Sequence, residues 1–317
     1  MNVSKSVRIP NTDIALYPVG FGTVSAGLDW DGKEAFALLD AFVDMGGNLI
    51  DTARIYSDWV KPEIGRSERV LGDWIRRRGH HNDIVLVTKG GHPDLNHMHT
   101  SRMTKKDMDH DLSLSMKALG VDCIDIYIYH RDDTAQPVAD LLGVMEDYVK
   151  EGKIRYYGCS NWTSARMKEA HSYAKAHSLR GFVANQMLFN MGLKYMNPFP
   201  DDTMVSMDAD MMEIHRTTDI LAMPYFGVCS GFFHILAAKG EQAVKASSYY
   251  TQGNLSVMKK ILSICEKYNV TITQVLLGFF YAQDFPVVPL ASSANIDQLR
   301  EIMAAPACNI KPGEYVF

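Results

Sequence analysis

The sequence predicts an α/β fold in which eight parallel strands and their helices close into a (β/α)8 TIM barrel. Apolar runs that read as buried strands alternate with amphipathic helical patterns along the chain, which is typical of a parallel sheet. One strand and its helix take about 40 residues, so the chain of 317 residues holds roughly eight such units. Asp51, Lys89 and His130 each close an apolar run, with separations of 38 and 41 residues, the length of one unit.

The predicted elements begin with a hairpin at 7–17, which we expect to cover the barrel floor. A helix at 33–45 is predicted from apolar residues at helical spacing, and Gly46 and Gly47 end it. The predicted barrel strands are 19–23, 48–50, 84–88, 124–129, 153–160, 181–185, 220–225 and 286–290. The other predicted helices are 67–78, 104–119, 138–149, 163–176, 255–268, 272–281 and 297–304, with a short helix before the seventh strand.

Two long loops are predicted after the sixth and seventh strands, at 187–208 and 227–253. Long loops at the strand ends of a compact barrel are usually functional, because short loops suffice for connection. No Pro/Ser/Gly-rich linker or charge block divides the chain. We therefore expect residues 1–317 to form a single barrel domain.

Composition excludes several classes of function. Hydrophobic residues make up 47% of the chain, enough for a large core, and a net charge of −5 gives no basic surface for nucleic acid. The first ten residues lack the apolar core of a signal peptide, and the apolar run 275–282 is too short to span a bilayer. The five cysteines form no Cys-x-x-Cys pair, so we expect a cytoplasmic protein without disulfides or zinc.

Residues at the carboxyl ends of parallel barrel strands meet at one mouth, so Asp51, Tyr56, Lys89 and His130 are predicted to lie together. These four residues, in this order, resemble the catalytic set of the aldo-keto reductases of bacterial type, which are (β/α)8 barrels that use NAD(P)H. The resemblance extends over almost the whole chain, to Leu299. It implies an oxidoreductase that reduces an aldehyde or ketone to the alcohol.

The chemistry of the four residues fits that reaction. Reduction of a carbonyl takes a hydride at carbon and a proton at oxygen, and Tyr56 is the predicted general acid. A Lys89 ammonium about 4 Å away would favour the phenolate by about 4 kcal/mol, or roughly three pKa units, at an effective dielectric of about 20. Asp51 is the expected partner of Lys89, and a neutral His130 is expected to orient the carbonyl oxygen.

The resemblance also implies the residues that bind the cofactor. Ser160, Asn161 and Gln186 resemble the residues that hold the nicotinamide carboxamide, and Tyr225 resembles the aromatic residue on which the nicotinamide ring stacks. Asp51 is also expected to contact the cofactor. The remaining cofactor-binding residues implied by the resemblance are Gly22, Thr23, Phe226, Ser230, Ser292, Ser293 and Gln298.

One departure concerns the 2′-phosphate of NADPH. After the eighth strand the family often carries a Lys-Ser pair and, five residues after the Ser, an Arg. Here Ser292 and Ser293 stand at the pair and Gln298 at the Arg position, while Arg300 follows two residues later. Lys239 is a second candidate cation. We favour NADP(H) as the cofactor, with NAD(H) as the alternative.

A polar carbonyl such as a sugar is the predicted substrate, because the expected walls mix aromatic and polar residues: Trp30, Trp59, Trp162, His92 and Asp132. His92, His97 and His99 could suggest a metal, but their spacing matches no familiar zinc pattern. We therefore predict no metal and expect His92 to lie at the substrate entrance.

Two other functions remain open. A barrel glycosidase needs two carboxylates across the mouth, and Asp51 and Asp132 could be considered, but Lys89 would then have no purpose. A nucleotide-sensing subunit that has lost activity is the rival that is not an enzyme, and the intact set of four residues disfavours it. The predicted partner is a small carbonyl compound, with no nucleic acid and no membrane. The sequence does not predict the oligomeric state.

Overall fold

The computed structural model describes residues 6–316, and its centre is one parallel sheet that closes on itself. The strands occur in the order β10-β3-β4-β5-β6-β7-β8-β9. Their bounds are β3 (Gly20–Gly22), β4 (Leu49–Asp51), β5 (Val85–Gly90), β6 (Ile124–Tyr129), β7 (Ile154–Ser160), β8 (Ala184–Gln186), β9 (Leu221–Ala222) and β10 (Leu290–Ala291). A parallel bridge between Ala222 and Val287 joins β9 to the segment before β10. The predicted (β/α)8 barrel is therefore confirmed.

The predicted hairpin is also present. Strands β1 (Val7–Arg8) and β2 (Ala15–Leu16) pair antiparallel, with Val7 opposite Leu16. The hairpin buries Ile9 and Leu16 in the same core cluster as barrel residues such as Val87 and Ile126. This cluster is the interior of the barrel, so the hairpin adds apolar side chains to it.

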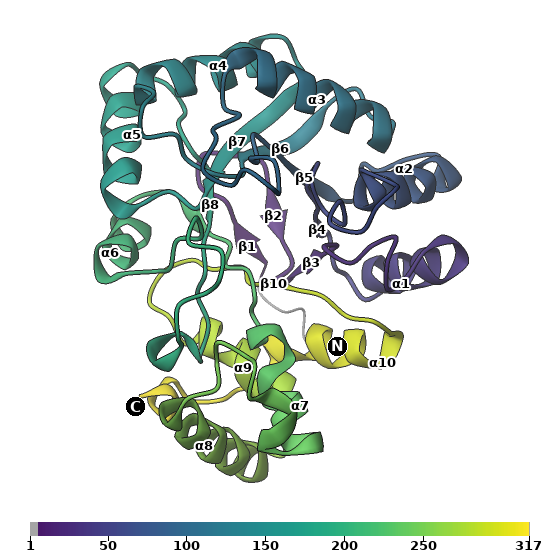
Figure 1. Ribbon diagram of the computed structural model, residues 1–317, viewed down its shortest axis with the longest axis vertical. Helices are drawn as coiled ribbons and strands as arrows, with labels where there is room; N and C mark the ends of the chain where they lie inside the picture. The colour runs from purple at the N-terminus through teal and green to yellow at the C-terminus, as the bar shows by residue number, and fades with distance from the viewer. Residues whose placement is uncertain (1–5, 317) are drawn as a thin grey trace.

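In the described residues, ten α-helices surround the strands (Figure 1). They are α1 (Gly32–Asp44), α2 (Arg66–Arg78), α3 (Lys105–Leu119), α4 (Val138–Lys150), α5 (Ser164–Ala176), α6 (Ala209–Thr217), α7 (Phe232–Lys239), α8 (Gln252–Tyr268), α9 (Ile272–Tyr281) and α10 (Ile296–Ala304). Local signals set several ends: the Thr104 side chain accepts a hydrogen bond from Asp107 N at the start of α3, and Gly120 ends that helix with a φ of 71°.

The alternation of side chains along β5 explains how Lys89 reaches the barrel interior. Val85 and Val87 belong to the interior cluster, whereas Leu86 belongs to the cluster between strands and helices. Because side chains alternate along a strand, Lys89 continues the interior series and Thr88 faces the helices. The same rule applies to β6, where Ile126 and Ile128 point inward and His130 follows in the same register.

The prediction of a long loop at 227–253 is corrected by the structure. It contains α7 and two short 3-10 turns, Cys229–Gly231 and Glu241–Val244. The helix forms because Phe232, Phe233 and Leu236 are buried in a separate cluster with residues of α8, a tertiary contact that outweighs the glycines on either side. Within residues 6–316, no helix combines the length and the apolar character that crossing a membrane requires.

Candidate active site

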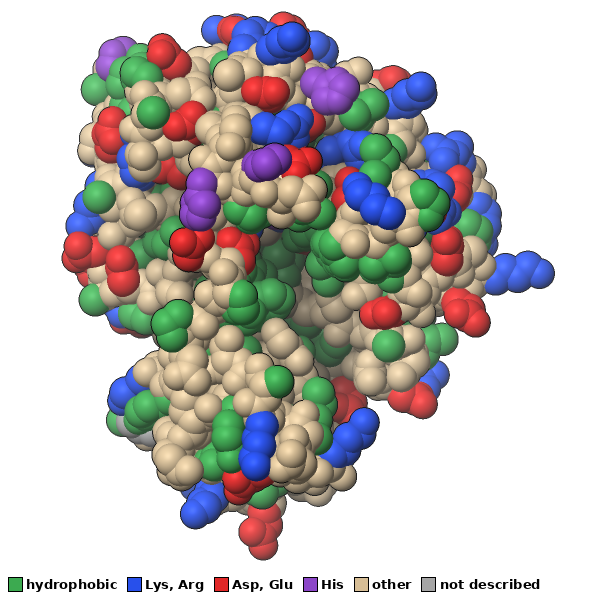
Figure 2. All heavy atoms as spheres, viewed as in Figure 1, with side chains coloured by type: hydrophobic (Ala, Val, Ile, Leu, Met, Phe, Trp, Pro, Cys, Tyr) green, Lys and Arg blue, Asp and Glu red, His purple; other side chains and the backbone are tan. Residues whose placement is uncertain are grey.

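Two adjoining hollows lie at the carboxyl ends of the barrel strands. The first, of about 210 Å³, is lined by residues at or just after the carboxyl ends of β4, β6, β7, β8 and β9, among them Asp51, His130 and Gln186. The second, of about 660 Å³, shares Val24, Phe226, Leu290 and Ser292 with the first. The face shown in Figure 2 is hollowed near its middle, where hydrophobic side chains form much of the wall.

Lys89 is the centre of the polar network below the first pocket. Its Nζ donates hydrogen bonds to Asp51 Oδ2 at 2.7 Å, to Thr52 O at 2.7 Å and to Tyr56 Oη at 2.8 Å. The ammonium has three protons and no lone pair, so these contacts use its full capacity. Lys89 is 1% exposed and does not line the pocket, whereas its partners Tyr56 and Asp51 do.

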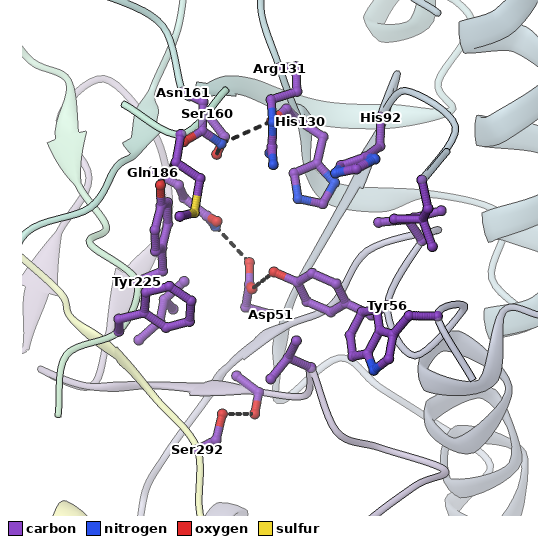
Figure 3. Close-up of a pocket in the computed structure, with 18 residues that line it drawn as sticks. Asp51, Tyr56, His92, His130, Arg131, Ser160, Asn161, Gln186, Tyr225 and Ser292 are labelled. Carbon is purple, nitrogen blue, oxygen red and sulfur yellow. Dashed lines mark hydrogen bonds between the residues drawn. The ribbon is translucent and has the colours of Figure 1, made fainter. Parts of the chain in front are cut away.

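This arrangement leaves the proton of Tyr56 available to the pocket. Because Lys89 can only donate, the Tyr56 oxygen must accept from it. Among residues 6–316, the remaining acceptor for the Tyr56 hydroxyl is Asp51 Oδ2, at a long 3.5 Å, which is a weak hydrogen bond. Figure 3 shows the Tyr56 ring at the pocket wall, with its hydroxyl beside Asp51. The geometry therefore suits a proton donor.

The pKa of Tyr56 differs from the sequence-based expectation. Burial, followed by the charge of Asp51, raises the pKa of Tyr56 well above 10, whereas we expected Lys89 to bring it close to neutral pH. Asp51 offsets the ammonium because both groups lie beside the phenol. Tyr56 therefore stays protonated before reaction, and the Lys89 hydrogen bond can stabilise negative charge as it forms on the oxygen.

His130 and His92 lie next to Tyr56 in the pocket wall (Figure 3). Their rings meet edge to face with centroids 4.7 Å apart. Burial, and then the charges of its neighbours, holds the pKa of His130 well below its usual value, and burial lowers the pKa of His92 to about 4. Both rings are neutral near pH 7. His92 Nδ1 lies 2.7 Å from Pro93 O, which can only accept, so Nδ1 carries the proton of that ring.

The wall across from Tyr56 is a hydrogen-bonded set of residues that includes Asn161. The Asn161 amide donates to His130 O and Ser160 Oγ and accepts from Tyr225 Oη at 2.6 Å and from Val205 N. These contacts fill its donor and acceptor capacity. The set joins the ends of β6 and β7 to the segments around β8 and β9 and fixes the position of the Tyr225 ring.

Gln186 has more capacity for a ligand. Its Nε2 donates to Asp51 Oδ1 at 2.6 Å, so the amide oxygen is the acceptor that a carboxamide could use. Ser160 Oγ accepts from Asn161, which leaves its hydroxyl proton as a donor. A nicotinamide carboxamide presents one acceptor and one donor group, so Gln186 and Ser160 have the complementary chemistry.

The second hollow contains several of the residues that the resemblance implied for the cofactor. Phe226, Ser230, Ser292 and Gln298 line it, and Gly22 lines the first pocket. Its polar wall is completed by His234, Thr273 and Glu301. The hollow continues from the Tyr225 wall, because Phe226 lines both hollows.

Other residues chosen from the sequence lie elsewhere. Thr23 is fully buried and bonds to Asp51 O and to Ser67. Ser293 is 5% exposed and lines neither hollow. Trp30 packs on Phe21 in the core.

Two further residues predicted to contact the substrate, Asp132 and Trp162, do not line the pocket. Asp132 forms an ion pair with Arg166 at 3.0 Å. Trp162 is fully buried against Phe182. Of the proposed substrate walls, Trp59 and His92 line the pocket.

Sequence reasoning missed Arg131 and most of the apolar wall. Arg131 donates to His130 O, to Thr203 Oγ1 and to Asp201, whose carboxylate lies 2.8 Å away, so it ties the end of β6 to the loop after β8. Its position next to His130 at a strand end was a usable signal. The apolar wall residues Val24, Ile55, Leu95 and Met204 come from loops, where the sequence pattern does not indicate which way a side chain points.

The three histidines in the segment after β5 have different surroundings. His92 is buried, whereas His97 and His99 are exposed, and His99 lies 3.4 Å from Asp202. In the described part of the chain, no group of three His, Cys, Asp or Glu side chains is placed to hold a metal ion.

The prediction that no metal is needed can be tested directly. Dialysis against a strong chelator is expected to leave turnover and melting temperature unchanged, because the Lys89 ammonium already supplies the positive charge of the acid–base network. A loss that zinc restores would contradict this prediction and would return attention to the three histidines.

Comparisons with known proteins point to one family. The sequence model of the Aldo/keto reductase family matches residues 18–315. An aryl-alcohol dehydrogenase of Pestalotiopsis microspora is 26% identical over 326 residues, which cover 96% of this chain and 80% of that protein. Protein tas of Escherichia coli K12 is 25% identical over 334 residues, with coverage of 92% and 90%. An NADP(+) aryl-alcohol dehydrogenase of Phanerodontia chrysosporium is 23% identical over 338 residues, with coverage of 97% and 83%.

Proposed function

Because the chain belongs to the Aldo/keto reductase family, we propose that it reduces an aldehyde or ketone to the alcohol with Tyr56 as the general acid. Members of this family use nicotinamide cofactors, and a bound NAD(P)H would supply the hydride. The observation that carries the proposal is the hydrogen-bond pattern of Lys89, which occupies the Tyr56 oxygen and leaves the phenol proton for the pocket.

Each residue has a defined part in the proposed reaction. The substrate carbonyl oxygen sits between Tyr56 and His130, whose ring centroids are 5.8 Å apart. As a hydride reaches the carbonyl carbon, the oxygen takes the proton of Tyr56, and the phenolate that remains is stabilised by Lys89. Asp51 keeps Lys89 charged through their 2.7 Å ion pair. Gln186 and Ser160 hold the carboxamide, and the Tyr225 ring forms the face against which the nicotinamide lies.

The lining of the pocket supports a substrate with an apolar group next to its carbonyl. Val24, Ile55, Leu95 and Met204 line it together with Trp59, which is 50% exposed. An aryl or alkyl aldehyde buries its carbon surface against these side chains, whereas a sugar would leave hydroxyls without partners. This favours an apolar carbonyl over the sugar suggested by the sequence.

We expect the reaction to take place in the cytoplasm, because free cysteines are typical of proteins in a reducing compartment.

Turnover distinguishes this proposal from its two rivals. NADPH or NADH is mixed with a model aryl aldehyde, and oxidation of the cofactor is followed by absorbance. The reductase is expected to oxidise one cofactor molecule for each alcohol molecule that it forms. A nucleotide-sensing subunit would bind the cofactor without consuming it, and a glycosidase would do neither, so either result would end the proposal.

The cofactor preference is a separate expectation. We favour NADP(H), in line with the NADP(+) in the name of one relative, but expect at most about a tenfold advantage in kcat/KM, roughly 1.4 kcal/mol. Ser292 and Gln298 offer neutral groups to a 2′-phosphate, and Glu301 lines the same hollow. Arg300 is exposed and pairs with Asp297 at 2.7 Å. A neutral contact contributes less than a charged one.

Paired variants of α10 test this expectation. Glu301→Gln is expected to raise the NADPH/NADH ratio of kcat/KM several-fold, because it removes a negative charge near the phosphate. Arg300→Ala is the control and should leave the ratio within about twofold. Equal or better use of NADH by the unaltered protein would refute the NADP assignment without affecting the catalytic residues.

A further inference from the structure

A buried polar cluster lies behind strand β5, on the side away from the pocket. Glu68 of α2 is fully buried, and Thr88 Oγ1 donates to its Oε1 at 2.6 Å. Its second oxygen, Oε2, has no hydrogen-bond partner among residues 6–316. The buried hydroxyls of Ser115 and Tyr127 also lack one within the described chain, and both lie near enough to Glu68 to interact with it electrostatically. A carboxylate in such a place is costly unless a cation compensates it.

Two short connections lead from Glu68 to Lys89. Thr88 precedes Lys89 in β5, so its side chain faces Glu68 while Lys89 points to the opposite side of the strand. Ser67, next to Glu68 in α2, hydrogen-bonds the Thr52 hydroxyl at 2.7 Å. Thr52 O in turn accepts from Lys89 Nζ at 2.7 Å. Glu68 is thus held behind the strand segment that carries the ammonium.

The charged groups around Glu68 are Asp111, Arg54 and Lys89. The carboxylate of Asp111 on α3 repels Glu68, and Arg54 favours its charged form. Glu68 in turn favours the ammonium form of Lys89. Asp111 itself is paired with Arg102. Burial, opposed by its hydrogen-bonding neighbours, raises the pKa of Glu68 to about 6. Glu68 is therefore mainly charged at neutral pH and more completely so in alkali.

Lys89 needs this charge because burial works against its ammonium form. Burial lowers the pKa of Lys89, while Asp51 and then Glu68 raise it. Asp51 lines the pocket and also holds Gln186, so its charge is shared with the substrate side. Glu68 does not line the pocket, so its charge acts on Lys89 without contact with the substrate. If Lys89 lost its proton, the amine could no longer stabilise negative charge on the Tyr56 oxygen.

We propose that Glu68 is a positioning residue of the active site: held behind β5 by Thr88, it supplies a second negative charge, after Asp51, that keeps Lys89 protonated. This inference rests on the role proposed above for Lys89. It predicts that Glu68 affects the pH dependence of the reaction without touching substrate or cofactor.

The first test is the pH profile of Glu68→Gln. The amide keeps the size of the side chain and an oxygen for Thr88. Loss of a negative charge lowers the pKa of both Lys89 and Tyr56, so the alkaline limb of kcat/KM for reduction should move to lower pH by about one unit. Glu146→Gln is the matched control, because Glu146 likewise accepts a hydroxyl from a strand residue, Tyr157, at 2.6 Å. The alkaline limb of kcat/KM for Glu146→Gln should stay at the pH of the unaltered protein.

The second test does not depend on catalysis. The infrared carbonyl band of protonated Glu68, assigned by its loss in Glu68→Gln, should titrate near the pKa of about 6. Coupling between two groups is reciprocal, so Lys89→Met should raise that pKa by about one unit. Lys153→Met is the control, since Lys153 pairs with Glu151 on the surface.

The two tests separate the failure of this inference from that of the reductase function. An unmoved infrared titration in Lys89→Met, or an unmoved alkaline limb in Glu68→Gln, would overturn the role of Glu68 even in a fully active enzyme. A protein that reduced no carbonyl compound would still report the coupling through the infrared band.

Discussion

Replacement of Tyr56 by Phe is expected to reduce carbonyl reduction by at least a thousandfold, within the range of general acid catalysis of about 10²–10⁴. The hydroxyl is the group that the pocket offers as a proton donor, since the Tyr56 oxygen is occupied by Lys89 and its proton is not. The cofactor should bind within a few-fold of its normal affinity, because its proposed contacts come from Gln186, Ser160 and Tyr225. Turnover of an aryl aldehyde and cofactor titration by fluorescence measure the two effects.

A tyrosine from the wall across the pocket provides the control. Tyr225→Phe retains the ring that would face the nicotinamide but loses the 2.6 Å hydrogen bond to Asn161. It should weaken cofactor binding while retaining measurable turnover at saturating cofactor. If Tyr56→Phe kept a tenth of normal turnover, the general-acid role would have to pass to another group, and His130 would be the first to examine.

The alternation of strands and helices was readable because each unit carries its own pattern and end signals. The predicted helix at 272–281 matches α9 (Ile272–Tyr281), where Thr271 and Gln274 form a capping box. Strand ends were equally informative, because the carboxyl-end rule brought Asp51, Tyr56, Lys89 and His130 to one place before any contact was known. The structure brings them within one hydrogen-bonded and ring-contacting group.

For residues outside the strands, the sequence pattern did not predict which way a side chain points. Trp30 and Trp59 are both aromatic residues in loops after barrel strands, yet one is 4% and the other 50% exposed. Asp132 appeared suited to the pocket, but Arg166 from α5 holds it elsewhere. These outcomes depend on partners that are remote in sequence, which a local pattern does not contain.

The same limit applies to Tyr56. From the sequence, Lys89 was expected to lower the pKa of Tyr56 by up to about three units, with Asp51 offsetting part of that effect. The structure adds burial, which together with the charge of Asp51 moves the pKa in the opposite direction. The phenol is thus kept protonated at rest, and the Lys89 hydrogen bond matters during proton transfer rather than before it.

Lys89→Met is expected to stop turnover and also to destabilise the protein. Asp51 would keep its hydrogen bond from Gln186 but would lose the cation 2.7 Å away, and both partners of this pair are nearly fully buried. Leaving one partner of a buried ion pair costs about 3–5 kcal/mol. Urea unfolding measures that loss. In any residual reaction the alkaline limb should move to higher pH, because the phenolate has lost its stabilising cation.

The double variant Asp51→Asn/Lys89→Met separates the two effects. It removes both charges, so most of the lost stability should return, since no uncompensated carboxylate remains in the interior. Turnover should not return, because the neutral pair cannot stabilise negative charge on the Tyr56 oxygen. Recovery of turnover together with stability would mean that Lys89 serves the fold alone, and an alkaline limb unchanged in Lys89→Met would point the same way. Stability without activity is the outcome that the hydrogen bonds of Lys89 predict.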